Sequence, residues 1–250
     1  MKRISMLLCA VAIVLMGCGN GTNNGKEGDN GGAKEEKKGT VTNEKPDPCT
    51  MKDYDGNTYK TVKIGKQVWM AENMRATHDR EGKAIALGSE ESYDTPYRYC
   101  PDNNSYNVKK YGYLYNYAAA KKVCPVGWHL PSEAEWTQLT DYLMDDGYSC
   151  GGEKENVAKA LASSQGWVGS DEECAVGNNP GANNASGFSA LPAGFYYGRY
   201  DYFGYGVYFW SATEYDASNA YYRLLDYRDA YVERYSYYKL DGYSVRCVRD

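Results

Sequence analysis

The sequence predicts an α+β fold, with helices in the first half of the folded part and a mostly antiparallel sheet in the second. Two observations lead to this class. A helix start signal with apolar residues at helical spacing follows Pro131, and short strand-like segments separated by polar turns begin at Phe188. The chain has 250 residues, of which 42% are hydrophobic, so it can form a domain with a buried core.

The N-terminus has the pattern of an export signal. Two basic residues precede an apolar stretch from Met6 to Met16, which is too short for an ordinary transmembrane helix. Gly17 and Cys18 then complete a segment that resembles a bacterial lipobox. We therefore expect residues 1–17 to be a lipoprotein signal peptide and Cys18 to be the lipidated first residue; the alternative is an ordinary signal peptide without lipidation.

Residues 18–48 are expected to be the lipidated Cys18 followed by a flexible linker. Between residues 19 and 48 there is no aromatic residue, and Val41 is the single large aliphatic one. Such a segment cannot bury enough apolar surface to offset its chain entropy. The expected location is the outer membrane, with the folded domain exposed at the cell surface and touching the membrane only through its lipid anchor.

The folded part opens with a hairpin pattern. Tyr59 to Ile64 alternates between apolar and polar residues, Gly65 and Lys66 can form a turn, and Gln67 to Met70 returns. Residues 78–110 are polar and irregular and are expected to form a long loop. Tyr113 to Lys122 is expected to be a short helix.

Two main helices are predicted in the middle of the chain. The first follows Pro131, where Ser132 and Glu135 have capping-box spacing, places Trp136, Leu139 and Leu143 on one face, and ends at Gly147. The second is predicted from Glu153 to Ser164. Residues 169–187, rich in Gly and Asn, are expected to form a loop before the strands.

The cysteines agree with an exported domain. Six remain after Cys9 and Cys18 are set aside, and an even number suggests three disulfides with fifteen possible connectivities. No pair has CxxC spacing and the chain has two His, so no metal is expected. No other cofactor is expected either. The net charge of −5 does not support a nucleic-acid partner.

Several phrases together resemble one family, the Fibrobacter succinogenes major paralogous (FISUMP) domain of bacterial surface lipoproteins. The predicted domain spans residues 49–250. In chain order the phrases are Asp55–Gly65, Trp69–Met74, Tyr111–Asn116, Cys124–Trp136, Gly187–Gly194, Phe209–Glu214 and Ser244–Asp250.

The segments Leu130–Trp136 and Arg246–Asp250 also resemble the formylglycine-generating enzyme group. That resemblance implies a C-type-lectin-like fold, a compact scaffold that presents a variable surface. The copper-binding Cys pair of the enzyme relatives has no counterpart here, and the Ca²⁺-sugar triplets of true C-type lectins are absent from the sequence. His129 has no nucleophile placed with it by motif, so we expect a structural role for it, no catalytic residue, and no enzymatic activity.

Three disulfides are expected within this scaffold. Cys124 with Cys247 would join the start of the scaffold to its last strand. Cys150 with Cys174 would close the second helix and the loop after it. Cys49 with Cys100 is then left by elimination.

The tyrosine content points to a binding surface. The chain has 27 Tyr against 4 Phe, and fifteen of the Tyr lie from Tyr196 onward. High strand propensity is one explanation, but Tyr mixed with Ser, Asp and Arg is also typical of paratopes. The candidate ligand-binding residues are Tyr200, Tyr202, Tyr205, Tyr208, Tyr215, Asp216, Tyr222, Asp226, Tyr227, Arg228, Asp229, Tyr231, Tyr235, Tyr237 and Tyr238.

This tail also resembles the variable proteins of diversity-generating retroelements, because Tyr, Asp, Ser and one Arg codon are reachable from an Asn AAC codon by changing adenines. The expected function is binding of an external protein or, second, a glycan. Two alternatives stay open. One is an oxidase related to the formylglycine-generating group, and the other is a structural envelope protein without an exchangeable ligand.

Overall fold

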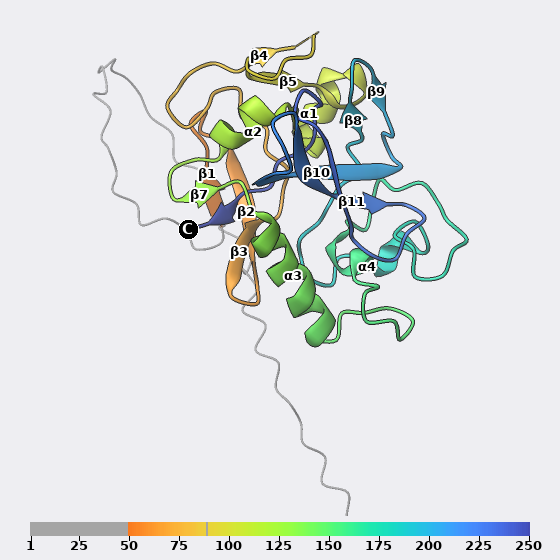
Figure 1. Ribbon diagram of the computed structural model, residues 1–250. Helices are drawn as coiled ribbons and strands as arrows, with labels where there is room; N and C mark the ends of the chain where they lie inside the picture. The colour runs from red at the N-terminus through yellow and green to blue at the C-terminus, as the bar shows by residue number, and fades with distance from the viewer. Residues whose placement is uncertain (1–49, 89) are drawn as a thin grey trace, which may run out of the picture. The chain divides into compact units, whose positions relative to one another are not determined.

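The computed structural model describes residues 50–88 and 90–250 (Figure 1). The predicted signal peptide at 1–17, the lipidation site Cys18, the linker to residue 48 and Cys49 lie outside the described residues. No helix in the described part of the chain is long and apolar enough to cross a membrane.

A five-stranded sheet brings the two ends of the described chain together. Its strand order is β1-β2-β3-β13-β7. The predicted hairpin is confirmed, since β2 and β3 pair antiparallel and Gly65 between them takes φ = +59°. The strands are β1 (Thr50–Lys52), β2 (Thr58–Ile64), β3 (Gln67–Met70), β7 (Trp128–His129) and β13 (Val248–Arg249).

The segment expected to be a long loop contains regular structure, so that prediction is wrong in part. Helix α1 forms because the Asn104 side chain caps it, accepting from the backbone N–H of Tyr106 at 3.0 Å. A three-stranded sheet of order β4-β5-β6 and further short helices also form in this part of the chain. These elements are β4 (Ala86–Leu87), β5 (Tyr97–Tyr99), η1 (Pro101–Asn103), α1 (Ser105–Tyr111), β6 (Leu114–Tyr115) and α2 (Tyr117–Val123). Helix α2 begins later than predicted because Asn116 is its N-cap.

The helix predicted after Pro131 is confirmed as α3 (Glu133–Asp145), which carries the capping box formed by Ser132 and Glu135. It buries Trp136, Leu139 and Leu143 completely. Burial of this apolar face, more than helix propensity, holds the helix in place.

The second long helix is a wrong prediction. Only α4 (Ala158–Leu161) forms there, so the described chain has one long helix instead of two. The flanking backbone is committed to other segments: Ala158 N–H donates to the carbonyl of Ala230 at 2.9 Å, and Ser163 N–H donates to that of Ala190 at 2.7 Å. Those bonds replace the ones that would extend the helix. The loop at 169–187 is confirmed, with only the 3₁₀ turn η2 (Pro180–Ala182) inside it.

The C-terminal strands form the antiparallel sheet that positions the candidate site. Strands β10 (Gly206–Glu214), β11 (Asn219–Asp226) and β12 (Glu233–Tyr238) pair in that order, beside the hairpin of β8 (Phe195–Tyr196) and β9 (Tyr200–Asp201). One face of this sheet packs on α3, which runs below it in Figure 1. The α+β class with mostly antiparallel strands is therefore confirmed; β4 and β5 form a parallel pair.

Two of the expected disulfides are present, Cys124–Cys247 and Cys150–Cys174. The third stays a prediction, because Cys49 lies outside the described residues. Cys100 is buried and forms no disulfide with another cysteine of residues 50–88 and 90–250.

Candidate functional site

Tyrosine rings form a continuous row across the C-terminal sheet, which we call the tyrosine row (Tyr205, Tyr202, Tyr208, Tyr222 and Tyr235). Ring centroids of successive members are 5.7, 6.3, 5.5 and 6.0 Å apart. The row starts in the β9–β10 turn and crosses β10, β11 and β12 because the register places these positions on one face. Cross-strand aromatic pairs of this kind stabilise the sheet that carries them.

The row is exposed at both ends, and its three inner rings are buried or half-buried. Tyr205 is 42% exposed and Tyr235 is 50% exposed, whereas Tyr222 is 9% exposed. Burial raises the pKa of Tyr208 and of Tyr222 above the ordinary value of tyrosine. The central rings therefore anchor the row, and its ends are free to contact a ligand.

The fifteen sequence-predicted residues fall into three classes of burial. Tyr222 and Asp226 are buried, so the expectation that they contact a ligand is corrected: they pack behind the residues that can. Five are half-buried, namely Tyr200, Tyr202, Tyr208, Tyr227 and Asp229. Eight are exposed, namely Tyr205, Tyr215, Asp216, Arg228, Tyr231, Tyr235, Tyr237 and Tyr238.

Asp226 shows what a buried member of this set does. Its carboxylate accepts from the Tyr202 hydroxyl at 2.9 Å and from Arg228 Nε at 3.3 Å, and Arg228 Nη2 also donates to the Tyr202 hydroxyl at 3.2 Å. Burial, with help from the Asp226 bond, raises the pKa of Tyr202 to about 12. Asp226 thus fixes the position of Tyr202 in the row.

Two acidic side chains, Asp229 and Glu233, lie near the Tyr235 end of the tyrosine row. Burial raises the pKa values of Asp229 and Glu233, and the nearby charge of Asp226 adds to both. The Tyr235 hydroxyl donates to Glu233 Oε1 at 2.8 Å. This end of the surface is therefore acidic as well as aromatic.

Asp216 and Tyr215 lie at the other end of the sheet, in the β10–β11 turn. The Asp216 carboxylate accepts from the backbone N–H groups of Ser218 and Asn219 at 2.8 and 2.7 Å. It therefore closes the turn, while Tyr215, which is 60% exposed, extends outward. The predicted residues thus spread along the sheet and do not converge on one pocket.

The opposite face of the sheet is framework. Glu133 at the start of α3 accepts from Arg223 Nη2 at 2.8 Å and from Arg234 Nε at 2.6 Å. Arg234 also lies over the Tyr221 ring, 4.0 Å from its centroid. These contacts tie β11 and β12 to α3 and explain why each of the two strands carries an Arg among its tyrosines.

His129 is held on both ring nitrogens. Its Nε2 lies 2.7 Å from Glu135 and its Nδ1 lies 2.5 Å from Asp250. Burial opposes protonation, but the hydrogen bonds to Asp250 and Glu135 outweigh it and raise the pKa of His129. His129 therefore joins the start of α3 to the C-terminal residue.

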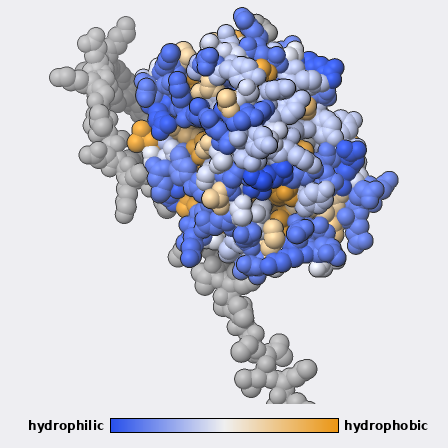
Figure 2. Space-filling model, viewed as in Figure 1, coloured by the Kyte–Doolittle hydropathy of each residue, from blue (hydrophilic) through white to orange (hydrophobic). Residues whose placement is uncertain are grey.

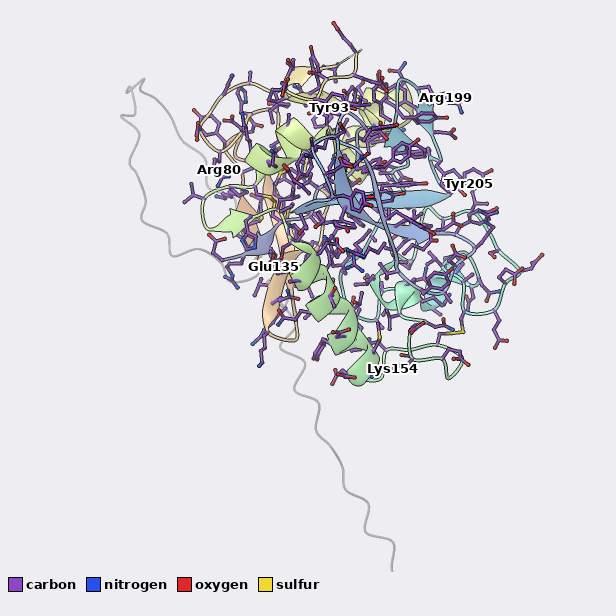
Figure 3. All side chains as sticks on the ribbon, viewed as in Figure 1. Arg80, Tyr93, Glu135, Lys154, Arg199 and Tyr205 are labelled. Atoms are coloured by element: carbon purple, nitrogen blue, oxygen red, sulfur yellow. A yellow bond between two sulfur atoms is a disulfide. The ribbon has the colours of Figure 1, made fainter. Side chains whose placement is uncertain are left out.

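A hollow of about 470 Å³ opens next to the exposed Tyr205 end of the row. It is lined by Asp102, Tyr200, Asp201, Tyr202, Phe203 and Tyr205. The sequence pattern did not single out Asp102, because it lies in the polar stretch before α1 and reaches the hollow only through the packing of η1. Tyr205 and Arg199 mark this side of the molecule in Figure 3.

Figure 2 shows no broad strongly hydrophobic patch on the face that it presents. Apolar contact area built from Tyr differs from a patch of Leu or Phe, because each ring carries a hydroxyl that water can solvate. Within residues 50–88 and 90–250, no three His, Cys, Asp or Glu side chains gather in a way that could hold a metal ion.

Comparisons with known proteins give one match. No curated protein and no solved structure matches the chain. The model of the Fibrobacter succinogenes major domain matches residues 62–249, which include the helix α3, the C-terminal sheet and the whole tyrosine row. Because that match covers most of the chain, the protein belongs to the Fibrobacter succinogenes major domain family.

Proposed function

We propose that this protein is a lipid-anchored cell-surface receptor that binds an external protein through the tyrosine row and the exposed tyrosines beside it. The observation that carries the proposal is the placement of the aromatic rings: Tyr205 and Tyr235 are the exposed ends of a row whose central rings are buried or half-buried. Rigid aromatic side chains give a large contact area at little cost in conformational entropy.

The dimensions of the surface favour a protein over a small ligand. Strand β12 alone has 6 residues, which corresponds to about 20 Å of extended chain. Exposed tyrosines lie at both ends of the sheet: Tyr205 lies at one end, and Tyr215 and Tyr238 lie at the other. A standard protein interface covers about 800 Å² per partner, and a surface of this length suits it.

The framework behind the surface supports the same proposal. Glu133 holds Arg223 and Arg234 from the α3 side of the sheet, and of the central rings in the tyrosine row Tyr222 is buried and Tyr202 and Tyr208 are half-buried. Exposed positions can therefore change without loss of the fold. We propose on this basis a C-type-lectin-like scaffold whose C-terminal surface is diversified by a retroelement. An adjacent template copy and reverse-transcriptase gene, with AAC-derived codons at the exposed positions, would support this history. Their absence would overturn it.

Binding is a better proposal than catalysis. His129, the one histidine within the family phrases, is engaged by carboxylates on both nitrogens, so neither is available as a general base. Outer-membrane anchoring rests on the N-terminal export pattern and is tested separately by metabolic labelling with a fatty acid, comparing the wild type with Cys18→Ser.

The binding proposal is tested with two matched triple variants. In the first, Tyr231, Tyr235 and Tyr237, which are 47%, 50% and 47% exposed, are replaced by Ala. In the control, three exposed tyrosines outside the C-terminal strands are replaced: Tyr54, Tyr93 and Tyr106, which are 59%, 42% and 89% exposed.

Cross-linking pull-downs of surface proteins, followed by affinity measurement with each purified candidate, should identify a ligand that the control variant retains and the first variant loses at least tenfold. A glycan array run with the same variants tests the second class of ligand. If every captured partner binds both variants and the wild type equally, the tyrosine surface is not the binding site.

A further inference from the structure

The hollow beside Tyr205 has a lining that excludes anionic ligands. Four aromatic rings and two carboxylates surround it, and no basic residue is among its lining residues. Its volume of about 470 Å³ lies in the range of small-ligand sites. A neutral polar group or a cation are the two kinds of ligand that the lining permits.

The hollow is built from backbone that is held in an unusual conformation. Tyr202 takes φ = +63° and Asp102 takes φ = +54°, both in the left-handed region that non-glycine residues seldom occupy. The N–H groups of Tyr205 and Gly206 donate to the Tyr202 carbonyl at 3.0 and 3.1 Å, which locks the turn. Strain that is held in this way is concentrated at functional sites, and a rigid site loses little entropy on binding.

Charge decides between the two permitted kinds of ligand. The Asp102 carboxylate is exposed and has no hydrogen bond or ion pair among the described residues. Asp201 is only weakly neutralised, since Arg199 lies 3.5 Å away and both side chains are exposed. Asp226, bonded to Tyr202 behind the hollow, is already paired with Arg228, so the negative charge that a ligand meets comes from Asp102 and Asp201. A cation entering here gains attraction that a neutral sugar does not.

We propose that this hollow binds a guanidinium group, an arginine side chain of the protein ligand, stacked on the aromatic rings and hydrogen-bonded to Asp102. The proposal rests on the proposed function and names the chemistry of one contact within it. A guanidinium suits the lining better than an ammonium does, because it is planar, stacks on aromatic faces and presents a fork of N–H donors to a carboxylate.

The test uses the full chain with ¹³C-labelled tyrosine, titrated with N-acetyl-L-arginine amide and followed by NMR. The matched probe is N-acetyl-L-citrulline amide, which has the same shape without the charge. We expect shifts of the Tyr200, Tyr202 and Tyr205 ring signals with a dissociation constant of about 1–10 mM, the range for a single side chain. The citrulline probe should bind at least tenfold more weakly.

Variants link the shifts to the hollow. Asp102→Asn should weaken arginine-amide binding at least fivefold with an unchanged melting temperature, because the side chain is exposed. Asp171→Asn, an exposed acid in the 169–187 loop, is the control and should bind like the wild type. Equal binding of the arginine and citrulline probes would overturn the proposal. If methyl glycosides bind and the arginine amide does not, the hollow is a sugar subsite, and this result would also overturn the proposal.

Failure of this inference is separable from failure of the proposed function. If Asp102→Asn keeps full affinity for a protein ligand that the Tyr231, Tyr235 and Tyr237 variant loses, the guanidinium subsite is wrong and the tyrosine surface stands. If neither variant loses a ligand, both proposals fail. Loss of affinity in both supports both.

Discussion

Replacing Asp241 with Asn should remove a large part of the pH dependence of stability between pH 4 and pH 7. The Asp241 side chain is 1% exposed and lies in the turn after β12, next to Gly242. Its one side-chain hydrogen bond in the described structure comes from the Tyr243 hydroxyl, which donates to Oδ2 at 3.1 Å. Asp241 forms no ion pair with any residue in the described part of the chain, so the buried carboxylate is more stable protonated.

The magnitude follows from the pKa. Burial raises the pKa of Asp241 from 3.8 to about 7, with Glu91 adding to the rise and the Tyr243 hydrogen bond opposing it. At 1.36 kcal/mol for each unit, this corresponds to about 4 kcal/mol. Because the folded state keeps the proton over a range in which the unfolded chain releases it, the free energy of unfolding falls as the pH rises from about 4 to 7.

Asparagine keeps an acceptor for Tyr243 and does not titrate. At pH 4 the variant should therefore match the wild type, and at pH 8 it should be more stable by up to about 4 kcal/mol. Urea unfolding followed by tryptophan fluorescence at four pH values gives the difference in the free energy of unfolding between the variant and the wild type. Taking the difference cancels the contributions of the other carboxylates.

Asp216→Asn serves as a control of opposite sign. The Asp216 pKa is lowered by hydrogen bonds from Asn219 and Ser218, so that variant should lose stability relative to the wild type as the pH rises through 4. If the difference between wild type and Asp241→Asn is the same at pH 4 and pH 8, Asp241 does not change its protonation on folding, and the reasoning from burial is refuted.

Two further predictions concern the framework. Glu133→Ala should lower the free energy of unfolding by about 3 kcal/mol, because it leaves the buried Arg223 without its carboxylate; a loss below 1 kcal/mol in urea unfolding would contradict this. His129→Gln should destabilise the protein by about 1 kcal/mol or less, since the side chains are partly exposed. The raised pKa of His129 places that loss below about pH 6.5, and it should vanish as the pH rises through the folded-state value. A thermal shift independent of pH would show that the bonds to Glu135 and Asp250 do not depend on charge.

Local signals predicted the elements that depend on local chemistry. The β2–β3 hairpin follows from the turn at Gly65, and α3 follows from the Ser132 capping box and the spacing of Trp136 and Leu139. The helix expected at 153–164 failed for the opposite reason. Its pattern is helical, but the bonds of Ala158 and Ser163 to distant carbonyls outweigh the propensity of the segment.

For the C-terminal tyrosines, too, some properties could be predicted from the sequence and others depend on the fold. The sequence alone determined that Tyr is concentrated after residue 196 and is mixed with Asp, Arg and Ser, and this was enough to predict a surface for binding. It could not separate Tyr222, which is buried, from Tyr235, which is exposed, because both lie in short strands that carry several Tyr and an Arg. Only the order β10-β11-β12 decided this: β11 is covered on both sides by its neighbours and β12 lies at the edge.

The hollow beside Tyr205 depended wholly on tertiary structure. Asp102 and Tyr202 are far apart in sequence, and no spacing rule relates them. They meet because η1 packs against β9. Composition thus determined which side chains this protein uses to make contact, since that is a property of the residues themselves. Strand order and packing decided which of them reach solvent and which carboxylates join them, because burial and charge arise only between segments that the fold brings together.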